Sequence, residues 1–295
     1  MTTIDLLYSQ NWKEYALLDS GEGERLEQFG RYLFRRPDPQ VLWKKTLTEQ
    51  DWNKADATFT RLQEDRGEWS YRTKVMPRWQ LGYEDLILWV EPTPFKHLGV
   101  FPEQAVHWDW MREQIEKRVN QSHSRPNVLN LFGYTGGASI ACAKSGAFVT
   151  HVDASRPAIS WAKENQVASG IDTDSIRWIL DDVLGFVRRE ARRGKKYDAI
   201  IMDPPSFGHG AKGEVWKFHT HFPQLLDACR EILSDTPLFV IVNAYAVSVS
   251  SLLLHTMLKE SIGSRGITTC GELGIQQKDS ERILSTGIYG RWALL

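Results

Sequence analysis

Residues 127–155 read NVLNLFGYTGGASIACAKSGAFVTHVDAS, and this stretch decides the fold. The apolar run NVLNLF predicts a strand that ends at the glycine-containing loop FGYTGG. GGASIACAKSG predicts a helix ended by Gly146, and FVTHVDAS predicts a second strand that ends at Asp153. This order of strand, loop, helix and strand is typical of a nucleotide-binding βαβ unit, although the loop is not the G-x-G-x-x-G of NAD enzymes.

The same alternation continues toward the C-terminus. Strands are predicted at 176–183, 197–206 and 237–245, and helices at 156–170, 183–194, 221–234 and 251–262. The tail, 271–295, predicts two strands joined by a polar turn, hence an antiparallel hairpin at the sheet edge. The fold class is therefore α/β, with a mostly parallel Rossmann-like sheet covered by helices on both faces.

The front of the chain has a different character. Short alternating runs separated by turn signals such as DSGEG (19–23) predict a small β-rich domain over residues 1–95. Residues 96–124 form a linker that carries an amphipathic helix, with Val106, Trp110, Ile115 and Val119 on its apolar face, and 125–295 is the Rossmann-like domain. Eight of the twelve tryptophans precede residue 111, which favours a core of large side chains over a platform for stacked bases.

Composition narrows the class of protein. A net charge of −1 is unlike the strong positive charge of a dedicated nucleic-acid module. The one dense basic segment, Arg188–Lys196, fits either a solvated helix end or a contact to RNA phosphates. No apolar run is long enough for a membrane span, the N-terminus predicts no secretory signal, and three scattered cysteines predict a reducing, cytoplasmic location.

Ligands of open α/β sheets lie beyond the carboxyl ends of the strands, where FGYTGG is predicted. Its glycines allow close approach of the backbone to a ligand and positive φ angles. Asp153, about 20 residues further on, can accept hydrogen bonds from both hydroxyls of a ribose. Asp181 or Asp182 could receive an adenine amino group, and DPPSF (203–207) forms a rigid turn whose carboxylate and carbonyls are fixed acceptors.

Together these segments resemble the class I S-adenosylmethionine-dependent methyltransferases. The matching motifs are NLFGYTGG, HVDAS, ILDDV and IIMDPPSF, in that order, over about 125–295. The linker FKHLGVFPEQAVHWDWM (95–111) and the closing TGIYGRW are most similar to the ribosomal large-subunit RNA base methyltransferases that have a small N-terminal domain.

The resemblance implies S-adenosyl-L-methionine as the cofactor and RNA, ribosomal above all, as the partner. The cofactor residues that it implies are Gln104, Phe132, Gly133, Tyr134, Thr135, Gly136, Gly137, Asp153, Ser155, Asp181, Asp182 and Asp203. The residues that it implies at the methyl-transfer site are Asp203, Pro204, Pro205 and Phe207.

The expected reaction is methylation of a base nitrogen. Acceptors in the DPP turn can hold an exocyclic amine, and Phe207 either stacks on a base that has left its helix or packs in the core. Cytosine-C5 methylation needs a thiolate, but the region after the fifth strand reads NAYAVS, without the cysteine found there in relatives with that activity.

One loop and several histidines allow more than one interpretation. The loop GHGAKGEVWKFHTHF (208–222), with His209, Lys212 and Lys217, fits either a nucleic-acid substrate or a flexible surface loop. His219 and His221 lack a third ligand, so no metal is expected, and His151 is expected to be a buried structural histidine. The alternatives are methylation of a small molecule or protein, a non-catalytic S-adenosylmethionine-binding protein, and a nicotinamide oxidoreductase.

Overall fold

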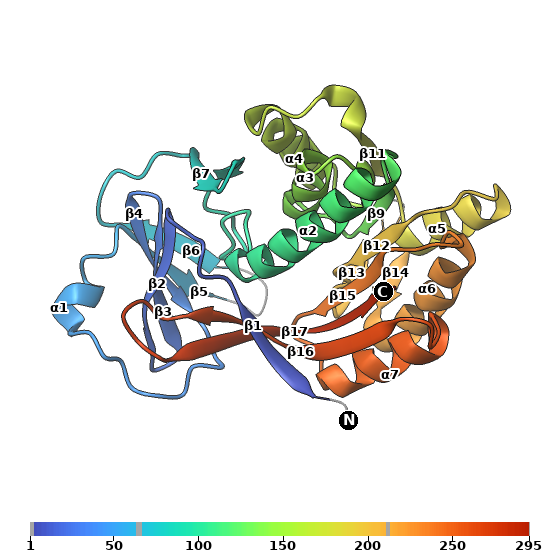
Figure 1. Cartoon of the computed structure of the whole chain (residues 1–295). Helices are drawn as coiled ribbons and strands as arrows, with labels where there is room; N and C mark the ends of the chain where they lie inside the picture. The colour runs from blue at the N-terminus through green and yellow to red at the C-terminus, as the bar shows by residue number, and fades with distance from the viewer. Residues whose placement is uncertain (1–2, 63–66, 211–212, 295) are drawn as a thin grey trace. The chain divides into compact units, whose positions relative to one another are not determined.

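The computed structural model describes residues 3–62, 67–210 and 213–294. Contacts divide the chain into two compact units, and the elements of each are drawn in Figure 1. The small unit comprises residues 8–103 and 274–285. The large unit comprises the residues before 8, residues 104–273 and those from 286 on. The domain boundaries drawn from the sequence, at 95 and 124, stay a prediction.

The small unit is rich in β-structure, as the sequence predicted. Its larger sheet has the order β2-β3-β4-β5-β6, in which β4 and β5 pair in parallel and the other pairs are antiparallel. A separate antiparallel hairpin is formed by β7 and β8. The elements are β2 (Tyr15–Gly21), β3 (Glu24–Phe29), β4 (Tyr32–Pro37), α1 (Glu49–Trp52), β5 (Ala57–Arg61), β6 (Gly67–Tyr71), β7 (Trp79–Tyr83) and β8 (Leu86–Val90).

The turn between β2 and β3 is the one that DSGEG predicted. Glu22 and Gly23 both have positive φ, 55° and 80°, which is the backbone of a type I′ hairpin turn. Tryptophans fill the interior of the unit: Trp52 and Trp79 are buried, and the ring of Trp79 stacks on Phe34 at 5.7 Å. These rings therefore lie in the core, the position that the composition favoured.

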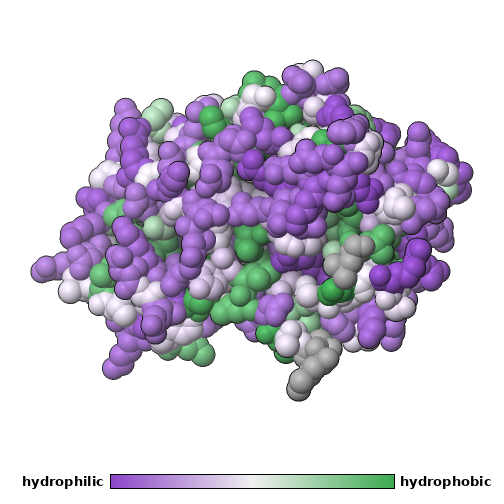
Figure 2. Space-filling view, in the orientation of Figure 1, coloured by the Kyte–Doolittle hydropathy of each residue, from purple (hydrophilic) through white to green (hydrophobic). Residues whose placement is uncertain are grey.

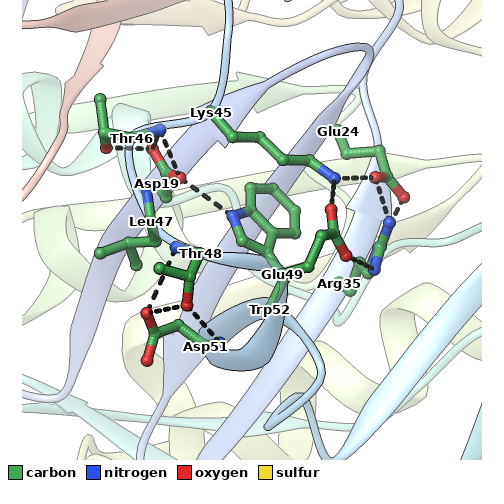
Figure 3. Close-up of polar contacts among 10 residues, drawn as sticks. All are labelled: Asp19, Glu24, Arg35, Lys45, Thr46, Leu47, Thr48, Glu49, Asp51 and Trp52. Carbon is green, nitrogen blue, oxygen red and sulfur yellow. Dashed lines mark hydrogen bonds and ion pairs between the residues drawn. The ribbon is translucent and has the colours of Figure 1, made fainter.

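A polar network surrounds the buried Trp52 (Figure 3). The indole nitrogen donates to Asp19 at 2.9 Å, and the Lys45 ammonium lies 4.2 Å from the ring centroid. The same ammonium donates to Glu24 and Glu49, each at 2.9 Å (Figure 3). Helix α1 has only four residues, too few for a helix to be stable alone, and it is held in place by its buried tryptophan.

The large unit contains an eight-stranded sheet of order β1-β16-β17-β15-β12-β9-β10-β11. Five strands, β9, β10, β11, β12 and β15, are parallel, and β17 pairs with β15 in antiparallel orientation. The strands are β1 (Ile4–Tyr8), β9 (Asn127–Leu131), β10 (Phe148–Asp153), β11 (Ile176–Leu180), β12 (Ala199–Met202), β15 (Phe239–Ala244), β16 (Ile267–Gln276) and β17 (Ile283–Ala293). The Rossmann-like sheet with the C-terminal strand pair is confirmed, but this pair does not form the edge of the sheet, because β1 pairs beyond β16.

Helices cover both faces of this sheet (Figure 1). One face packs on α5, α6 and α7 through a continuous apolar core that includes Leu129, Val152, Ile200 and Val240. On the other face lie α2, α3 and α4 (Figure 1). The helices are α2 (Ala105–Ser122), α3 (Gly137–Lys144), α4 (Arg156–Ala168), α5 (Val183–Arg192), α6 (Phe218–Ile232) and α7 (Ser251–Ser261).

The structure differs from the sequence interpretation at α2. Of the predicted apolar face only Ile115 is buried, while Val106, Trp110 and Val119 are half-buried. The buried positions of the predicted region are rotated toward Trp108 and Met111, because α2 packs on α3. The prediction of an amphipathic helix holds, but the face was placed one or two residues away.

A second difference concerns residues 208–222, for which a flexible loop was one interpretation. This segment begins with two short strands, β13 (Phe207–His209) and β14 (Val215–Lys217), which pair antiparallel. α6 then starts at Phe218, three residues before the predicted start. Lys212 lies outside the described residues.

None of the described helices combines the length and apolar character needed to cross a bilayer. Hydrophilic residues cover most of the face in view in Figure 2.

Candidate functional site

The predicted site residues of the large unit follow neighbouring strands at one edge of the sheet. In the register, Leu131 of β9 pairs with Val152 of β10 and with Met202 of β12, and Asp153 pairs with Leu180 of β11. Because these strands are parallel, the segments that follow them emerge at the same edge. Strand order reverses at β9, which lies between β10 and β12, and such a switch point is where open α/β sheets bind ligands.

The loop after β9 has an unusual backbone. Phe132, Tyr134 and Gly136 have φ angles of 57°, 50° and 86°, in the left-handed region. Positive φ is uncommon for non-glycine residues and costs on the order of 1 kcal/mol or more at each, so it persists only where surrounding contacts hold it. Here the Gly133 N–H donates to the Val152 carbonyl at 3.2 Å, and the Asn165 side chain donates to the Thr135 carbonyl at 2.9 Å.

Gly133 lies directly on a buried polar network. The side chain of Asn130 donates to the Ser139 hydroxyl at 2.8 Å, and that hydroxyl is 2.9 Å from Nδ1 of His151. A Cβ on Gly133 would overlap both the His151 ring and the Asn130 amide. A side chain at this position would therefore displace the loop, and this steric demand, rather than positive φ, requires the glycine.

His151 is a buried structural histidine, as expected. Burial lowers its pKa to about 3, so the ring is neutral at physiological pH. Gly137 has a similar steric role, because a Cβ there would meet the ring of Trp108 on α2 at 2.7 Å. Among the three glycines of the loop only Gly136 has the positive φ that the sequence argument invoked.

Asp153 ends β10 with a half-buried carboxylate. One oxygen accepts the Tyr134 N–H at 2.8 Å and the other accepts the Ser155 N–H at 2.7 Å. Burial raises the pKa of Asp153 above its ordinary 3.8, against the lowering effect of these backbone donors. Ser155 itself is the N-cap of α4, because its hydroxyl accepts the Ala158 N–H at 3.3 Å.

The paired carboxylates after β11 have different environments. Asp182 is the N-cap of α5, and one of its oxygens accepts the Gly185 N–H at 2.7 Å. Asp181 forms a close ion pair with Arg189 and also accepts the Asp182 N–H at 2.9 Å. The Asp181 carboxylate is thus already engaged by a cation of its own chain.

The turn Asp203–Phe207 follows β12. The Asp203 N–H donates to the Leu131 carbonyl at 3.3 Å, and the Pro205 carbonyl accepts the indole N–H of Trp216 at 2.7 Å. Pro204 is buried, and Phe207 is 54% exposed. The interpretation of Phe207 as a core residue is therefore wrong, because its ring stands at the surface, where it meets the His209 ring at 5.2 Å.

Gln104, at the start of α2, lies beside this turn. Its amide nitrogen donates to Asp203 at 3.3 Å and to the Tyr245 hydroxyl at 2.7 Å, and its oxygen accepts from Asn243 at 3.0 Å. The side-chain amide thus uses both donors and its oxygen, which fixes its orientation. A Cβ on Gly287 would meet the Tyr245 ring at 2.8 Å, so a glycine of the closing TGIYGRW makes room for that ring. Sequence reasoning named Gln104 but had no signal for Tyr245 as its partner.

The other titratable groups fit structural roles. Cys142, Cys229 and Cys270 are free and buried, and burial raises the pKa of each thiol. In the described ranges, no three His, Cys, Asp or Glu side chains come together as a metal site. His221 pairs through Nδ1 with the backbone of Lys217.

Most of the basic segment Arg188–Lys196 lies away from this edge, although its Arg189 reaches back to pair with Asp181. α5 begins at the carboxyl edge, at its N-cap Asp182, and runs back, so its C-terminal residues lie at the opposite edge of the sheet. There Arg193 pairs with Glu190 at 3.1 Å, and Lys196 donates to the Glu231 carbonyl at 2.8 Å. This geometry favours the helix-end interpretation of the segment over contact with a substrate in the site.

A cavity of about 350 Å³ lies in the small unit and includes none of the predicted site residues. Its lining residues are Ser9, Gln10, Trp12, Tyr15, Ala16, Leu17, Pro102 and residues 274–280. Sequence reasoning missed this cavity because its walls come from segments about 260 positions apart in the chain.

The fold and the site together define a class of protein. The sequence profile of the S-adenosylmethionine-dependent methyltransferase family matches residues 61–262. The chain therefore belongs to this family, it is an enzyme that transfers methyl groups, and its cofactor is S-adenosyl-L-methionine. This result excludes the nicotinamide oxidoreductase alternative.

Particular relatives refine the class. A solved S-adenosylmethionine-dependent methyltransferase from Agrobacterium tumefaciens is 42% identical, with 98% of this chain and 93% of that chain covered and a TM-score of 0.93. A protein crystallised with S-adenosylhomocysteine shares the fold, at 18% identity and a TM-score of 0.71 over 97% of this chain and 76% of that one.

Curated relatives are similar over shorter stretches. Ribosomal RNA large subunit methyltransferase K of Neisseria meningitidis serogroup B is 26% identical over 182 residues, 61% of this chain and 48% of that protein. Ribosomal RNA large subunit methyltransferase I of Aeromonas salmonicida is 36% identical over 113 residues, 38% of this chain and 26% of that protein. The matched region thus spans less than half the length of either relative.

Proposed function

We propose that this protein methylates a base nitrogen of RNA, with ribosomal RNA as the substrate class. The observation that carries the proposal is the acceptor-rich turn Asp203–Phe207 at the same sheet edge as Asp153 and the loop of residues 132–137. Support for RNA comes from relatives that are named ribosomal RNA large subunit methyltransferases.

The cofactor residues proposed from the sequence fit a nucleoside with a charged sulfur. When bound, S-adenosylmethionine supplies an electrophilic methyl group on a sulfonium. The Asp153 oxygens accept the backbone N–H groups of Tyr134, Ser155 and Ala154, and a carboxylate has about four lone-pair sites, which leaves one for a ribose hydroxyl. The residues proposed to surround the rest of the cofactor are Gln104, Phe132, Gly133, Tyr134, Thr135, Gly136, Gly137, Ser155, Asp182 and Asp203.

Asp182 is the better candidate of the two neighbouring carboxylates for the adenine amino group. Asp181 is paired with Arg189, so receiving a neutral amine there would weaken an ion pair. Asp182 uses one oxygen to accept the Gly185 N–H as N-cap, and its other oxygen is proposed to accept the adenine amino group.

The turn suits an amine nucleophile. The Pro205 carbonyl accepts the Trp216 indole N–H, and the acceptors proposed for the N–H groups of an exocyclic amine are the Asp203 carboxylate and the Pro204 carbonyl. Holding both N–H groups aims the nitrogen lone pair along one direction, and such positioning is the main task in a displacement at a methyl group. Gln104 would keep Asp203 in place for this purpose.

A thiolate mechanism has no candidate nucleophile. All three cysteines are buried with raised pKa values, and the segment that follows β15, which begins at Tyr245, contains no cysteine. Mass spectrometry of RNA nucleosides from strains with and without the gene should show unchanged 5-methylcytosine. A loss of 5-methylcytosine in the deletion strain would contradict this part of the proposal.

The decisive experiment compares substrate pools. Purified protein and radiolabelled S-adenosylmethionine are incubated separately with RNA, protein and small-molecule extracts of a deletion strain, and label is expected in ribosomal RNA. Label in another pool would support the metabolite or protein alternative, which the net charge of −1 favours. Binding of S-adenosylhomocysteine without labelling of any pool would indicate a non-catalytic protein. A ribosomal substrate would place the protein in the cytoplasm, which the unpaired cysteines also favour.

A further inference from the structure

The hairpin formed by β13 and β14, which begins at the end of the Asp203–Phe207 turn, has one exposed face with both apolar and basic side chains. In its register, Phe207 pairs with Lys217, Gly208 with Trp216, and His209 with Val215. Because side chains alternate along a strand, Phe207, His209, Val215 and Lys217 point to one side and Trp216 points to the other. All four are exposed, with Phe207 at 54% and Val215 at 46%. These four residues are called the hairpin face.

The opposite side of the hairpin is anchored in the large unit. Trp216 is buried, its indole N–H bonds the Pro205 carbonyl, and its ring packs edge-on against Phe132 at 4.9 Å. Phe132 belongs to the loop that follows β9. A single side chain thus ties the hairpin to both the candidate cofactor loop and the candidate methyl-transfer turn, so the hairpin face has a fixed position relative to both.

We propose that the hairpin face binds the nucleotides that flank the target base in a single-stranded RNA segment. The inference rests on the proposed function. A base that reaches Asp203 and Pro204 must be attached to a strand that passes the residues bordering this turn. Phe207 lies two residues beyond Pro205, within roughly 7 Å along the backbone, so the strand has to run across the hairpin face.

The chemistry of the four side chains fits single-stranded RNA. An exposed aromatic ring stacks on any base, and a cation beside it attracts the phosphate. Lys217 pairs directly with Phe207 in the register of the hairpin. The His209 ring packs edge-on against the Phe207 ring, at an interplanar angle of 87°. The hairpin face contains no carboxylate that would repel a phosphate backbone.

Size distinguishes RNA from a protein partner. A stable protein interface buries about 800 Å² on each side, which is about 20–30 residues. Four side chains on two three-residue strands fall far below that area. One or two nucleotides match the extent of the hairpin face better.

The test separates stacking from charge. Phe207→Leu keeps an apolar side chain but removes the ring, and Lys217→Gln removes one cation. The matched controls are Phe95→Leu, at a phenylalanine that is 53% exposed, and Lys259→Gln, at an exposed lysine on α7. Each protein is assayed with ribosomal RNA extracted from a strain that lacks the gene, and the affinity for S-adenosylhomocysteine is measured by calorimetry.

Phe207→Leu should raise the KM for this RNA about fivefold or more, because a stacked base contributes a factor of this size. Lys217→Gln should reduce the slope of log affinity against log salt by about 0.7, the value for one phosphate contact of a single strand. Both variants should bind S-adenosylhomocysteine within about twofold of the parent, and both controls should match the parent in every measurement.

Two results would overturn the inference, and they are distinguishable. If RNA is methylated and both hairpin variants keep the parental KM and salt slope, the hairpin face does not bind RNA while the proposed function stands. If S-adenosylhomocysteine binds but the RNA accepts no methyl group, the proposed function fails and this inference fails with it. Should Phe207→Leu also lose affinity for S-adenosylhomocysteine, the salt slope of Lys217→Gln decides.

Discussion

Two carboxylates, one in each unit, show how the same group serves structure or binding. Asp19 in the small unit is fully buried and accepts the N–H groups of Ser20, Thr46 and Leu47 and the indole N–H of Trp52 (Figure 3). Asp153 in the large unit is half-buried and accepts the backbone N–H groups of Tyr134, Ser155 and Ala154. The first is saturated by its own chain, and the second is not.

The pKa values of the two groups move in opposite directions for this reason. Burial would raise the pKa of Asp19, but hydrogen bonds led by Thr46, Leu47 and Trp52 outweigh burial and lower it. At Asp153 burial prevails over three backbone bonds and the pKa rises. A buried carboxylate with few hydrogen bonds pays a desolvation free energy that its own protein does not offset. The hydroxyls of a bound ligand can offset it, and this is the behaviour expected of a binding group.

Replacing the saturated carboxylate should have the largest effect. Asp19→Asn puts an amide nitrogen in place of one oxygen, which leaves at least one buried N–H donor unsatisfied and removes the charge that strengthens the remaining bonds. The free energy of unfolding should fall by roughly 3–5 kcal/mol. Chemical denaturation measures this loss. Calorimetry on the protein that remains folded should show an unchanged affinity for S-adenosylhomocysteine, and a weakened affinity would contradict a purely structural role.

The reciprocal variant, Asp153→Asn, should reverse the pattern. Hydrogen bonds to a charged acceptor contribute about 1.5–3 kcal/mol, so the dissociation constant of S-adenosylhomocysteine should rise roughly 10- to 100-fold. Stability should change little, because the asparagine oxygen can keep one backbone bond. The two variants control each other. The comparison breaks down if Asp153→Asn destabilises the fold as much as Asp19→Asn does.

The part of the candidate site that lies at strand ends was predictable from the sequence. Asp153 and Asp203 were found because each ends an apolar strand, and parallel strands bring such ends to one edge. The reason for Gly133 was not predictable, because His151 and Asn130 become its neighbours only through the register of β9 and β10. Sequence pattern fixes the face of a strand but not which side chains touch across elements.

The hairpin of β13 and β14 escaped prediction for a related reason. Each strand has only three residues, too few for a recognisable alternation, and the intervening segment is rich in glycine. The buried Trp216 that holds it is identified only by its partners Pro205 and Phe132. Residues 274–285 likewise belong to the small unit through contacts that the tail sequence does not signal.

Asp153 and Asp19 should be protonated at different pH values as the solution is acidified. The pKa of Asp153 is raised above 3.8, so as the pH falls this group is protonated first, and a neutral carboxyl accepts ribose hydroxyls less well. The pKa of Asp19 is lowered, so the stability it contributes is present above pH 3.8 and is lost only as the pH falls further, through that lowered pKa.

Affinity should therefore fall before the fold does. Protonation of Asp153 does not itself destabilise the protein, because the folded state binds that proton more tightly than the unfolded state. Calorimetry with S-adenosylhomocysteine between pH 7 and about pH 4 should show affinity falling by up to about tenfold per pH unit while circular dichroism stays constant. Simultaneous loss of both signals would mean that Asp153 does not control binding. Asp153→Asn should remove the pH dependence.

A third carboxylate, Asp203, accepts a bond of 3.3 Å from Gln104, and the smallest effect is expected from a change in a neighbour of that glutamine. Tyr245→Phe removes the hydroxyl that accepts the second N–H of that amide, so Gln104 would hold Asp203 less firmly. One neutral hydrogen bond contributes about 1 kcal/mol, so kcat should fall roughly fivefold while KM for RNA and the affinity for S-adenosylhomocysteine stay within about twofold.

The matched control is Tyr197→Phe, which removes a buried hydroxyl bonded to Glu190 at 2.7 Å at the opposite edge of the sheet. That variant should lose some stability and keep its kcat, because its hydrogen bond lies away from Asp203. If both tyrosine variants lowered kcat equally, the effect of Tyr245 would be a general loss of packing. A fall in kcat confined to Tyr245→Phe would instead mean that the Gln104 amide orients the Asp203 carboxylate. Such dependence on one neighbouring side chain, in contrast to the many bonds at Asp19, is expected of a carboxylate that binds a substrate.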